Sequence, residues 1–211
     1  AELATQRAQR EAAKVADSAQ KVFPIILLLI YIVIAFTFRS YSQPLLLIIM
    51  VPFAFIGVGW GHWIHDFPVN VLSLLGIIAL IGIIVNDGLV FIAKFNGYLK
   101  EGFQYDEAIL KAGNSRFRAI FLTSITTVAG LSPLIFETSR QAQFLIPMAI
   151  SIAYGIAIAT VLTLIMLPML LSVSNSVKVY VKWFWEGKKP SKESVERAIK
   201  EITSEAEADE I

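Results

Sequence analysis

Asp87 is the only carboxylate that lies away from the ends of the long apolar segments of this sequence. It stands in the run Gly82-Ile-Ile-Val-Asn-Asp-Gly88, directly after Asn86. Burying a carboxylate in hydrocarbon costs several kcal/mol, so such a residue usually faces a bundle interior or water and marks an ion or proton route. Because loss of water favours the neutral acid, proton uptake and release become feasible there. Asp87 is therefore the leading candidate for a proton carrier.

A cluster of hydroxyl side chains occupies a later apolar segment. Its members are Thr123, Ser124, Thr126 and Thr127. Counting inward from the polar end of that segment places Thr126 and Thr127 at a depth close to that of Asp87, where a hydroxyl can bond a carboxyl group in either protonation state. The alternative is that these hydroxyls bond backward to their own helix or hold helices together. Both roles stay open for the threonines.

His62, His65 and Asp66 have spacing close to that of metal ligands at the end of a helix. Two histidines and one acid at a water interface are far more often solvated surface than a metal site, so no metal is expected. The sequence also lacks a paired His-Glu motif, a nucleophile elbow and a Walker-type loop. An enzyme is therefore not expected.

The composition predicts a membrane protein. Apolar residues make up 56% of the chain and charged residues 17%, whereas a soluble domain carries about a quarter charged residues. The charges gather in short blocks between apolar runs of about 20 residues, the length that crosses a bilayer as a helix. Cysteine is absent, which excludes disulfides and thiolate metal sites. We expect an all-α membrane protein whose partner is the lipid bilayer and not a nucleic acid.

The sequence predicts five spanning helices, which together form a transmembrane domain over residues 22–174. The expected spans are about 22–38, 45–64, 69–95, 119–136 and 144–173. Between the third and fourth spans, residues 105–112 form an amphipathic pattern typical of a short helix at the membrane surface, with Gly113 as its C-cap. Residues 175–211 are expected to form an interfacial segment followed by a charged tail.

The placement of Lys and Arg predicts the orientation of the spans. The segment between spans three and four carries four basic residues, and seven more lie between Lys178 and Lys200. The connection from His62 to Asn70 has no Lys or Arg, and that between spans four and five has only Arg140. This pattern puts the N-terminus outside and the C-terminus in the cytoplasm, although four basic residues before the first span oppose it.

Five ordered blocks between Asn70 and Leu170 resemble the C-terminal membrane half of transporters of the resistance-nodulation-cell division (RND) superfamily, in its hydrophobe/amphiphile efflux (AcrB-like) branch. The blocks are Leu72-Ser-Leu-Leu-Gly-Ile-Ile-Ala-Leu-Ile-Gly-Ile-Ile-Val-Asn-Asp-Gly88, Glu107-Ala-Ile with Ala112-Gly113, Arg116-Phe-Arg-Ala-Ile-Phe-Leu-Thr-Ser-Ile-Thr-Thr127, Gly130-Leu-Ser-Pro-Leu134 and Gln143-Phe-Leu-Ile-Pro-Met-Ala-Ile150.

The resemblance implies helices eight to twelve of a twelve-helix efflux pump in the inner membrane. Such pumps are built from two six-helix halves with inserted extracytoplasmic domains, assemble as trimers and are driven by protons without another cofactor. The expected partners are therefore the N-terminal half, the extracytoplasmic domains and further copies of the chain. Residues 1–21 would be a helical extracytoplasmic lead-in, and the chain would be a piece of a longer protein.

The resemblance also assigns roles to individual residues. Asn86 stands where many drug pumps of the family have a lysine that pairs with carboxylates on another helix, and Asp87 stands where they often have asparagine. Thr123 matches the relay threonine of the family, and Arg116 matches the arginine at its cytoplasmic entry. The expected proton relay is therefore Asp87, Asn86, Thr123 and Arg116, with possible support from Thr126 and Thr127.

The function expected from these observations is a contribution to proton-coupled substrate export. Two alternatives stay open. One is a relative that exports proteins or lipids with the same membrane repeat, although the run from Arg116 to Thr123 argues against the protein-export type. The other is a membrane scaffold that folds and associates without coupling.

Overall fold

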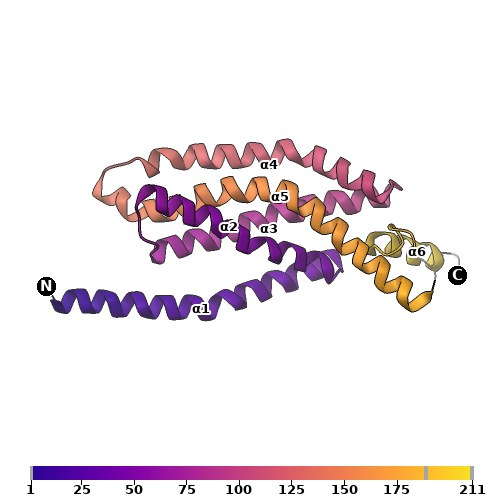
Figure 1. Ribbon diagram of the computed structural model, residues 1–211, viewed down its shortest axis with the longest axis horizontal. Helices are drawn as coiled ribbons and strands as arrows, with labels where there is room; N and C mark the ends of the chain where they lie inside the picture. The colour runs from indigo at the N-terminus through magenta and orange to yellow at the C-terminus, as the bar shows by residue number, and fades with distance from the viewer. Residues whose placement is uncertain (1, 188–189, 210–211) are drawn as a thin grey trace.

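The structure, a computed structural model, describes residues 2–187 and 190–209, and the elements in them are helices (Figure 1). Within these residues five helices are long and apolar enough to cross a membrane. The expected all-α fold with about five spans is confirmed. The helices are α1 (Glu2–Phe38), α2 (Ser42–His65), α3 (Val71–Lys100), α4 (Tyr105–Ile135), α5 (Arg140–Glu186) and α6 (Arg197–Asp209).

The expected surface helix over residues 105–112 is not a separate element. Those residues form the first turns of α4, which continues without a break to Ile135. A helix that stops at a C-cap glycine usually places that glycine in the left-handed region, and Gly113 is not among the glycines with positive φ. The prediction that a short helix ends at Gly113 was therefore wrong, because α4 continues through Gly113 and the residues after it.

α5 is also longer than predicted. The fifth span was expected to end near residue 173, but α5 runs on to Glu186. It ends where Gly187 takes a left-handed φ of 72° and donates its backbone N–H to the carbonyl oxygen of Trp183 at 2.9 Å. The interfacial segment expected after residue 174 therefore begins as a continuation of the same helix.

Short polar turns fix the connections between the spans. Asn70 caps α3 by accepting the backbone N–H groups of Leu72 and Ser73 at 3.0 and 3.1 Å, and the hydroxyl of Ser73 accepts the N–H of Asn70. This reciprocal arrangement satisfies donors that the first turn of a helix leaves free. Asp66 and Arg39 take left-handed φ values of 53° and 46° where α2 and α1 end.

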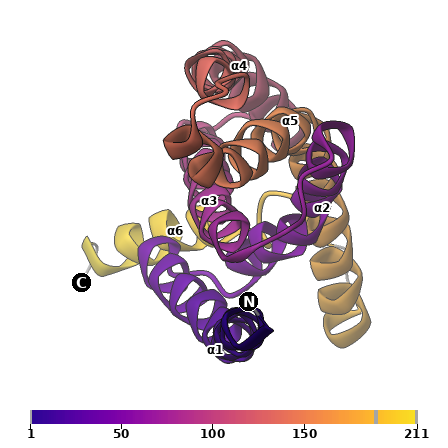
Figure 2. The same cartoon turned by 90° about the vertical axis from the view of Figure 1, so that its left-hand side faces the viewer.

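α5 is the central helix of the bundle. It packs against α2, α3 and α4, and the view along the bundle shows α4 and α1 on opposite sides of these inner helices (Figure 2). Pro168 lies inside α5, where a missing N–H removes one helical hydrogen bond and favours a bend. The last part of α5 leaves the direction of the bundle in Figure 1.

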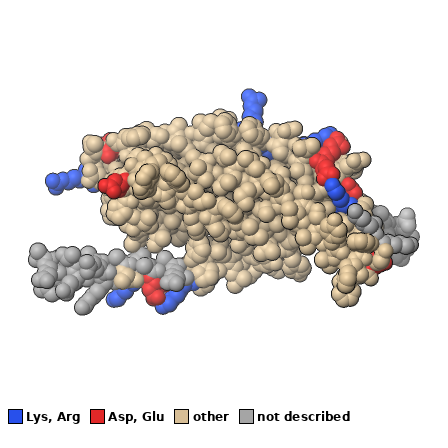
Figure 3. Space-filling model, viewed as in Figure 1, with Lys and Arg blue, Asp and Glu red and all other residues tan. Residues whose placement is uncertain are grey.

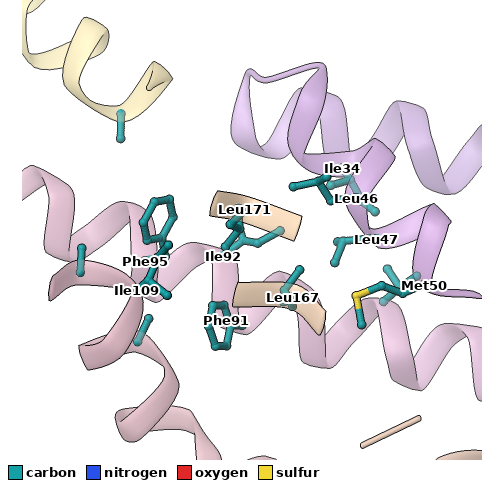
Figure 4. Packing of buried hydrophobic residues seen from close by; sticks show 14 of the residues in the cluster. Ile34, Leu46, Leu47, Met50, Phe91, Ile92, Phe95, Ile109, Leu167 and Leu171 are labelled. Atoms are coloured by element: carbon teal, nitrogen blue, oxygen red, sulfur yellow. The ribbon is translucent and has the colours of Figure 1, made fainter. Parts of the chain in front are cut away.

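Buried apolar side chains from the five spans meet in one core (Figure 4). Ile34 of α1 and Leu47 of α2 are fully enclosed there, as are Phe91 of α3 and Leu167 of α5. Inside a bilayer such packing stabilises by close contact, because lipid tails are as apolar as the side chains. Gly76 of α3 illustrates the closeness, since a Cβ atom there would lie 2.7 Å from the carbonyl oxygen of Met148.

The tail segment, residues 190–209, is fastened to the same end of the bundle as the α3–α4 connection. The Glu193 carboxylate accepts the backbone N–H of Tyr105 at 2.9 Å. Glu196 is 2% exposed and accepts hydrogen bonds from Asn175 at 2.8 Å and Lys178 at 3.0 Å. The expected charged tail is therefore docked against α4 and α5 over its first residues.

Charge is distributed unevenly over the molecule. Figure 3 shows the charged side chains of this face gathered mainly toward the two ends, while the middle of the bundle is largely uncharged. The uncharged middle matches the apolar belt that a bilayer requires of a spanning protein.

Candidate functional site

Asp87 lies near the middle of α3 and is half-buried. Its neighbour Gly88 packs directly against Leu47 of α2, so Asp87 stands at the edge of the buried face of the helix. Among the residues that the structure describes, none donates a hydrogen bond or forms an ion pair with the Asp87 carboxyl group. A carboxyl group without a partner is costly to place in an apolar surrounding.

Asn86 is exposed on the surface of the described bundle. One residue corresponds to about 100° of rotation around a helix, so Asn86 lies on the side of α3 that points away from the Gly88 contact. Asn86 and Asp87 therefore form a polar edge on α3 that extends from the buried face to the surface.

The three threonines of α4 donate hydrogen bonds to their own helix. Thr123 bonds the carbonyl oxygen of Ala119 at 2.9 Å, Thr126 bonds that of Leu122 at 2.9 Å, and Thr127 bonds that of Thr123 at 2.8 Å. None of them bonds Asp87 in the described structure. The backward bonding keeps each hydroxyl satisfied and leaves its oxygen able to accept another donor.

Ser124 is the member of the hydroxyl cluster that joins two helices. It is buried, and its hydroxyl lies within a short hydrogen bond of the Thr160 hydroxyl on α5. The structural role considered for the cluster therefore applies to Ser124. The more exposed threonines, by contrast, do not hold α4 to the helices described here.

Arg116 lies on the same stripe of α4 as Thr123 and Thr127, because residues seven and eleven apart return to nearly the same face of a helix. It is half-buried, and its Nε atom is buried without a hydrogen-bond partner among the described residues. A buried donor in this state is rare enough in folded proteins to require an explanation.

α4 exposes most of its apolar surface. Only 17% of its apolar stretch is buried in the described bundle, against 50% for α2. Its stripe of Arg116, Thr123 and Thr127 runs along this little-covered helix, which packs against α3. The predicted relay residues thus lie on two adjacent helices, without direct hydrogen bonds between them.

The interpretation of His62 as solvated surface was wrong. His62 is 5% exposed, and its ring nitrogens lie 3.0 Å from the carbonyl oxygen of Phe67 and 3.0 Å from the Ser151 hydroxyl on α5. A ring nitrogen of His65 lies 2.9 Å from the hydroxyl of Tyr154, which is also on α5. Both histidines therefore join the end of α2 to α5. Within the described residues, no group of three or more His, Cys, Asp or Glu side chains is arranged to hold a metal ion.

An amide pair that sequence analysis missed joins α2 to α3. Gln43 and Asn96 exchange two side-chain hydrogen bonds at 2.9 and 3.2 Å. The only indication in the sequence is that both amides adjoin apolar segments, where polar side chains tend to bond one another across helices.

Within the described residues, five helices are long and apolar enough to cross a membrane, and Asp87 lies near the middle of one of them. These features define an all-α membrane protein. The family model of the AcrB/AcrD/AcrF family matches residues 3–174. The chain therefore belongs to this family of RND superfamily transporters.

Similar curated proteins include the cobalt-zinc-cadmium resistance protein CzcA of Cupriavidus metallidurans, which is 30% identical over 74% of this chain and 15% of its own length. The swarming motility protein SwrC of Bacillus subtilis is 29% identical over 76% of this chain and 16% of its own length. The multidrug resistance protein MdtC of Erwinia amylovora is 26% identical over 73% of this chain and 15% of its own length.

A solved structure with a similar fold is a crystal structure of a heavy metal efflux pump. It has a TM-score of 0.67 and 27% sequence identity, and the match covers 81% of this chain and 16% of that one. The chain spans about 15% of the length of the curated relatives. Because these relatives include a metal resistance protein and a multidrug resistance protein, they support the superfamily rather than the hydrophobe/amphiphile branch alone.

Proposed function

We propose that this chain supplies proton-coupling helices to an efflux transporter of the RND superfamily, with Asp87 as the group that binds and releases the proton. The observation that carries the proposal is the position of Asp87, half-buried near the middle of α3 and without a hydrogen-bond partner among the described residues. A carboxyl group held in this way exchanges its proton at a lower cost than one fixed in an ion pair.

The exposed polar stripe of α4 is proposed to face further membrane helices of the transporter. Thr123 and Thr127 keep acceptor capacity on their oxygens, and the half-buried Arg116 adds a cation to the same stripe. Side chains of this type hold helices together in membranes and form relays where they meet a carboxyl group. In the assembled pump, Asn86 and this stripe would line the path by which protons reach Asp87.

The proposed location is the inner membrane, with the N-terminus outside and the C-terminus in the cytoplasm. The end of the bundle that holds the tail segment carries Lys100, Lys178 and Lys192, and basic residues favour the cytoplasmic side. The proposal also includes a trimer that contains the other membrane half and extracytoplasmic domains, as the family resemblance implies. No cofactor other than the proton is proposed.

Transport by the complete protein in proteoliposomes with an imposed pH gradient tests the role of Asp87. Because the relatives include metal and multidrug resistance proteins, both Zn²⁺ and a fluorescent amphiphilic cation serve as trial substrates. We expect Asp87→Asn to lower coupled transport at least tenfold, because the amide cannot take up a proton, and Asp87→Glu to retain much of it. Transport by Asp87→Asn at the level of the unaltered protein would refute the proposal and favour the membrane scaffold.

A further inference from the structure

A basic pocket opens where the α1–α2 turn, the end of α5 and the tail segment meet. Its volume is about 590 Å³. Five cationic side chains and one carboxylate contribute to its wall. These are Arg39, Lys178, Lys182, Arg197, Lys200 and Glu186.

The cations of the basic pocket are only partly neutralised. Lys178 pairs with Glu196 at 3.0 Å, and Lys182 pairs with Glu186 at 3.7 Å. Arg197 lies 3.5 Å from Glu201, a carboxylate that Lys100 also contacts at 3.1 Å.

Arg39 and Lys200 form no ion pair with the side chains that the structure describes. The pKa of the Glu201 carboxyl group is lowered mainly by the hydrogen bond from Lys100, but the charge of Arg39 contributes as well. The five cations of the pocket thus share the carboxylates Glu186, Glu196 and Glu201, which leaves an excess of positive charge. Such an excess of positive charge in a concave site attracts an anion.

A second cavity adjoins the basic pocket along α1. Its volume is about 550 Å³, and Ala35 and Phe36 form part of its wall. Arg39, Tyr41 and Arg197 line both cavities. Ala35 and Phe36 give the second cavity an apolar side next to its arginines. A charged site beside such an apolar side suits a ligand with an anionic head and hydrocarbon chains.

The pocket lies at the end of the first candidate span, where lipid headgroups are expected. Arg39 directly follows Phe38, the last residue of the first spanning helix. Three aromatic side chains near the pocket residues in the sequence are each more than 80% exposed: Tyr41, Phe184 and Trp185. Tyrosine and tryptophan favour the boundary between hydrocarbon and water. A bound anion would therefore share its depth with the phosphates of the membrane.

We propose that the basic pocket binds the phosphate of an anionic phospholipid, with the acyl chains along Ala35 and Phe36 of α1. Arg39 and Lys200, which form no ion pair within 4.0 Å among the described side chains, supply the excess charge, and the paired cations Lys178 and Arg197 complete the wall. Basic pockets between spanning helices on the cytoplasmic side are suited to such headgroups. A lipid in this position would join α1, α5 and the tail segment through one ligand. The site is separate from Asp87 and does not depend on proton coupling.

Native mass spectrometry of the protein released from detergent tests the site with three probes: phosphatidylglycerol, phosphatidylcholine and inorganic phosphate. We expect phosphatidylglycerol to bind at least tenfold more tightly than the other two. The double variant Arg39→Asn/Lys200→Gln should lose this preference by about tenfold. Asparagine suits the left-handed backbone at residue 39, so the turn should persist.

The matched control is Arg118→Gln/Arg140→Gln, which removes the same charge from exposed side chains of α4 and α5 outside the pocket. It should change phosphatidylglycerol binding less than twofold, and both variants should unfold at the same temperature as the unaltered protein in lipid-free detergent. Equal losses in the two variants would overturn the site in favour of general electrostatic attraction. Binding of inorganic phosphate as tightly as phosphatidylglycerol would overturn the lipid assignment.

Discussion

The side-chain amides of Gln43 and Asn96 bond each other twice, so that each acts as both donor and acceptor between α2 and α3. Gln43 is 2% exposed, and its amide would be unsatisfied in an apolar surrounding without this partner. The pair fixes the register of two neighbouring helices close to the end of the bundle where the tail segment docks.

Replacement of Gln43 by leucine should lower the free energy of unfolding in detergent by about 1 kcal/mol, because hydrogen bonds between membrane helices contribute on that scale and the Asn96 amide loses its partner. The double variant Gln43→Leu/Asn96→Leu should recover part of the loss, since no unpaired amide remains. If the losses of the two single variants simply add in the double variant, the amides do not act as a pair.

Two glycines on α3 should respond differently to alanine. Gly76→Ala should lower the free energy of unfolding by about 1–3 kcal/mol, because the new methyl group would lie 2.7 Å from the Met148 carbonyl oxygen and 2.9 Å from Ser151 Cβ. Gly82→Ala is the matched control, with no atom within 4 Å of the added carbon. It should be neutral or slightly stabilising, since alanine favours the helix. Similar losses for both would contradict the described α3–α5 packing.

The carboxylate of Glu193 should make the docking of the tail segment dependent on pH. The hydrogen bond from the Tyr105 backbone N–H is the largest cause that holds the pKa of Glu193 below its ordinary value, and a carboxylate is stabilised at the start of a helix. Because the pKa is lowered in the folded state, the stabilisation is complete above pH 4.5, the ordinary value. It is lost as the pH falls through the lowered pKa.

Melting curves of the unaltered protein and of Glu193→Gln between pH 3 and pH 7 measure this effect. At pH 7 the variant should be about 0.5–1 kcal/mol less stable, the scale of a side-chain helix cap, and the difference should shrink below pH 4.5. Glu107→Gln, on the exposed first turn of α4, should change stability by less than about 0.5 kcal/mol. A difference for Glu193→Gln that is constant over the whole range would show that the ionised carboxylate is not the stabilising species.

The orientation of the spans is open to chemical labelling because the chain contains no cysteine. A single cysteine at Val69, in the α2–α3 connection, should react with a membrane-impermeant maleimide in intact cells. A single cysteine at Glu101, after α3, should react only after the membrane is permeabilised. Both expectations follow from the basic residues near α4 and the tail, and the opposite pattern would reverse the proposed orientation.

Much of the fold could be predicted from apolar segments alone. Runs of about 20 apolar residues dictate spanning helices because lipid offers no partner to a backbone N–H or C=O group. The ends of the helices were less predictable. Residues 105–112 look amphipathic and residues 119–136 apolar, yet one backbone hydrogen-bond ladder passes through Gly113, and a change of side-chain pattern does not interrupt it.

Asp87 could be singled out as a candidate because the cost of a buried carboxyl group is visible in the sequence itself. The contacts of His62 could not be predicted from the sequence. Its partner Ser151 is 89 residues away in the chain, and no spacing rule connects a histidine at the end of one span with a serine in another. The role of Asp87 and the threonines as a proton relay stays a prediction that the proposed transport assay addresses.

The continuity of α5 has a mechanical consequence. Its 47 residues extend about 70 Å as a helix, far more than the roughly 30 Å of hydrocarbon in a bilayer. Near one end Ser151 is held by His62, and near the other Asn175 is held by Glu196. Pro168 lies between these two attachment points. A change in the bend of α5 at Pro168 by a few degrees would therefore move the tail segment relative to the end held by His62.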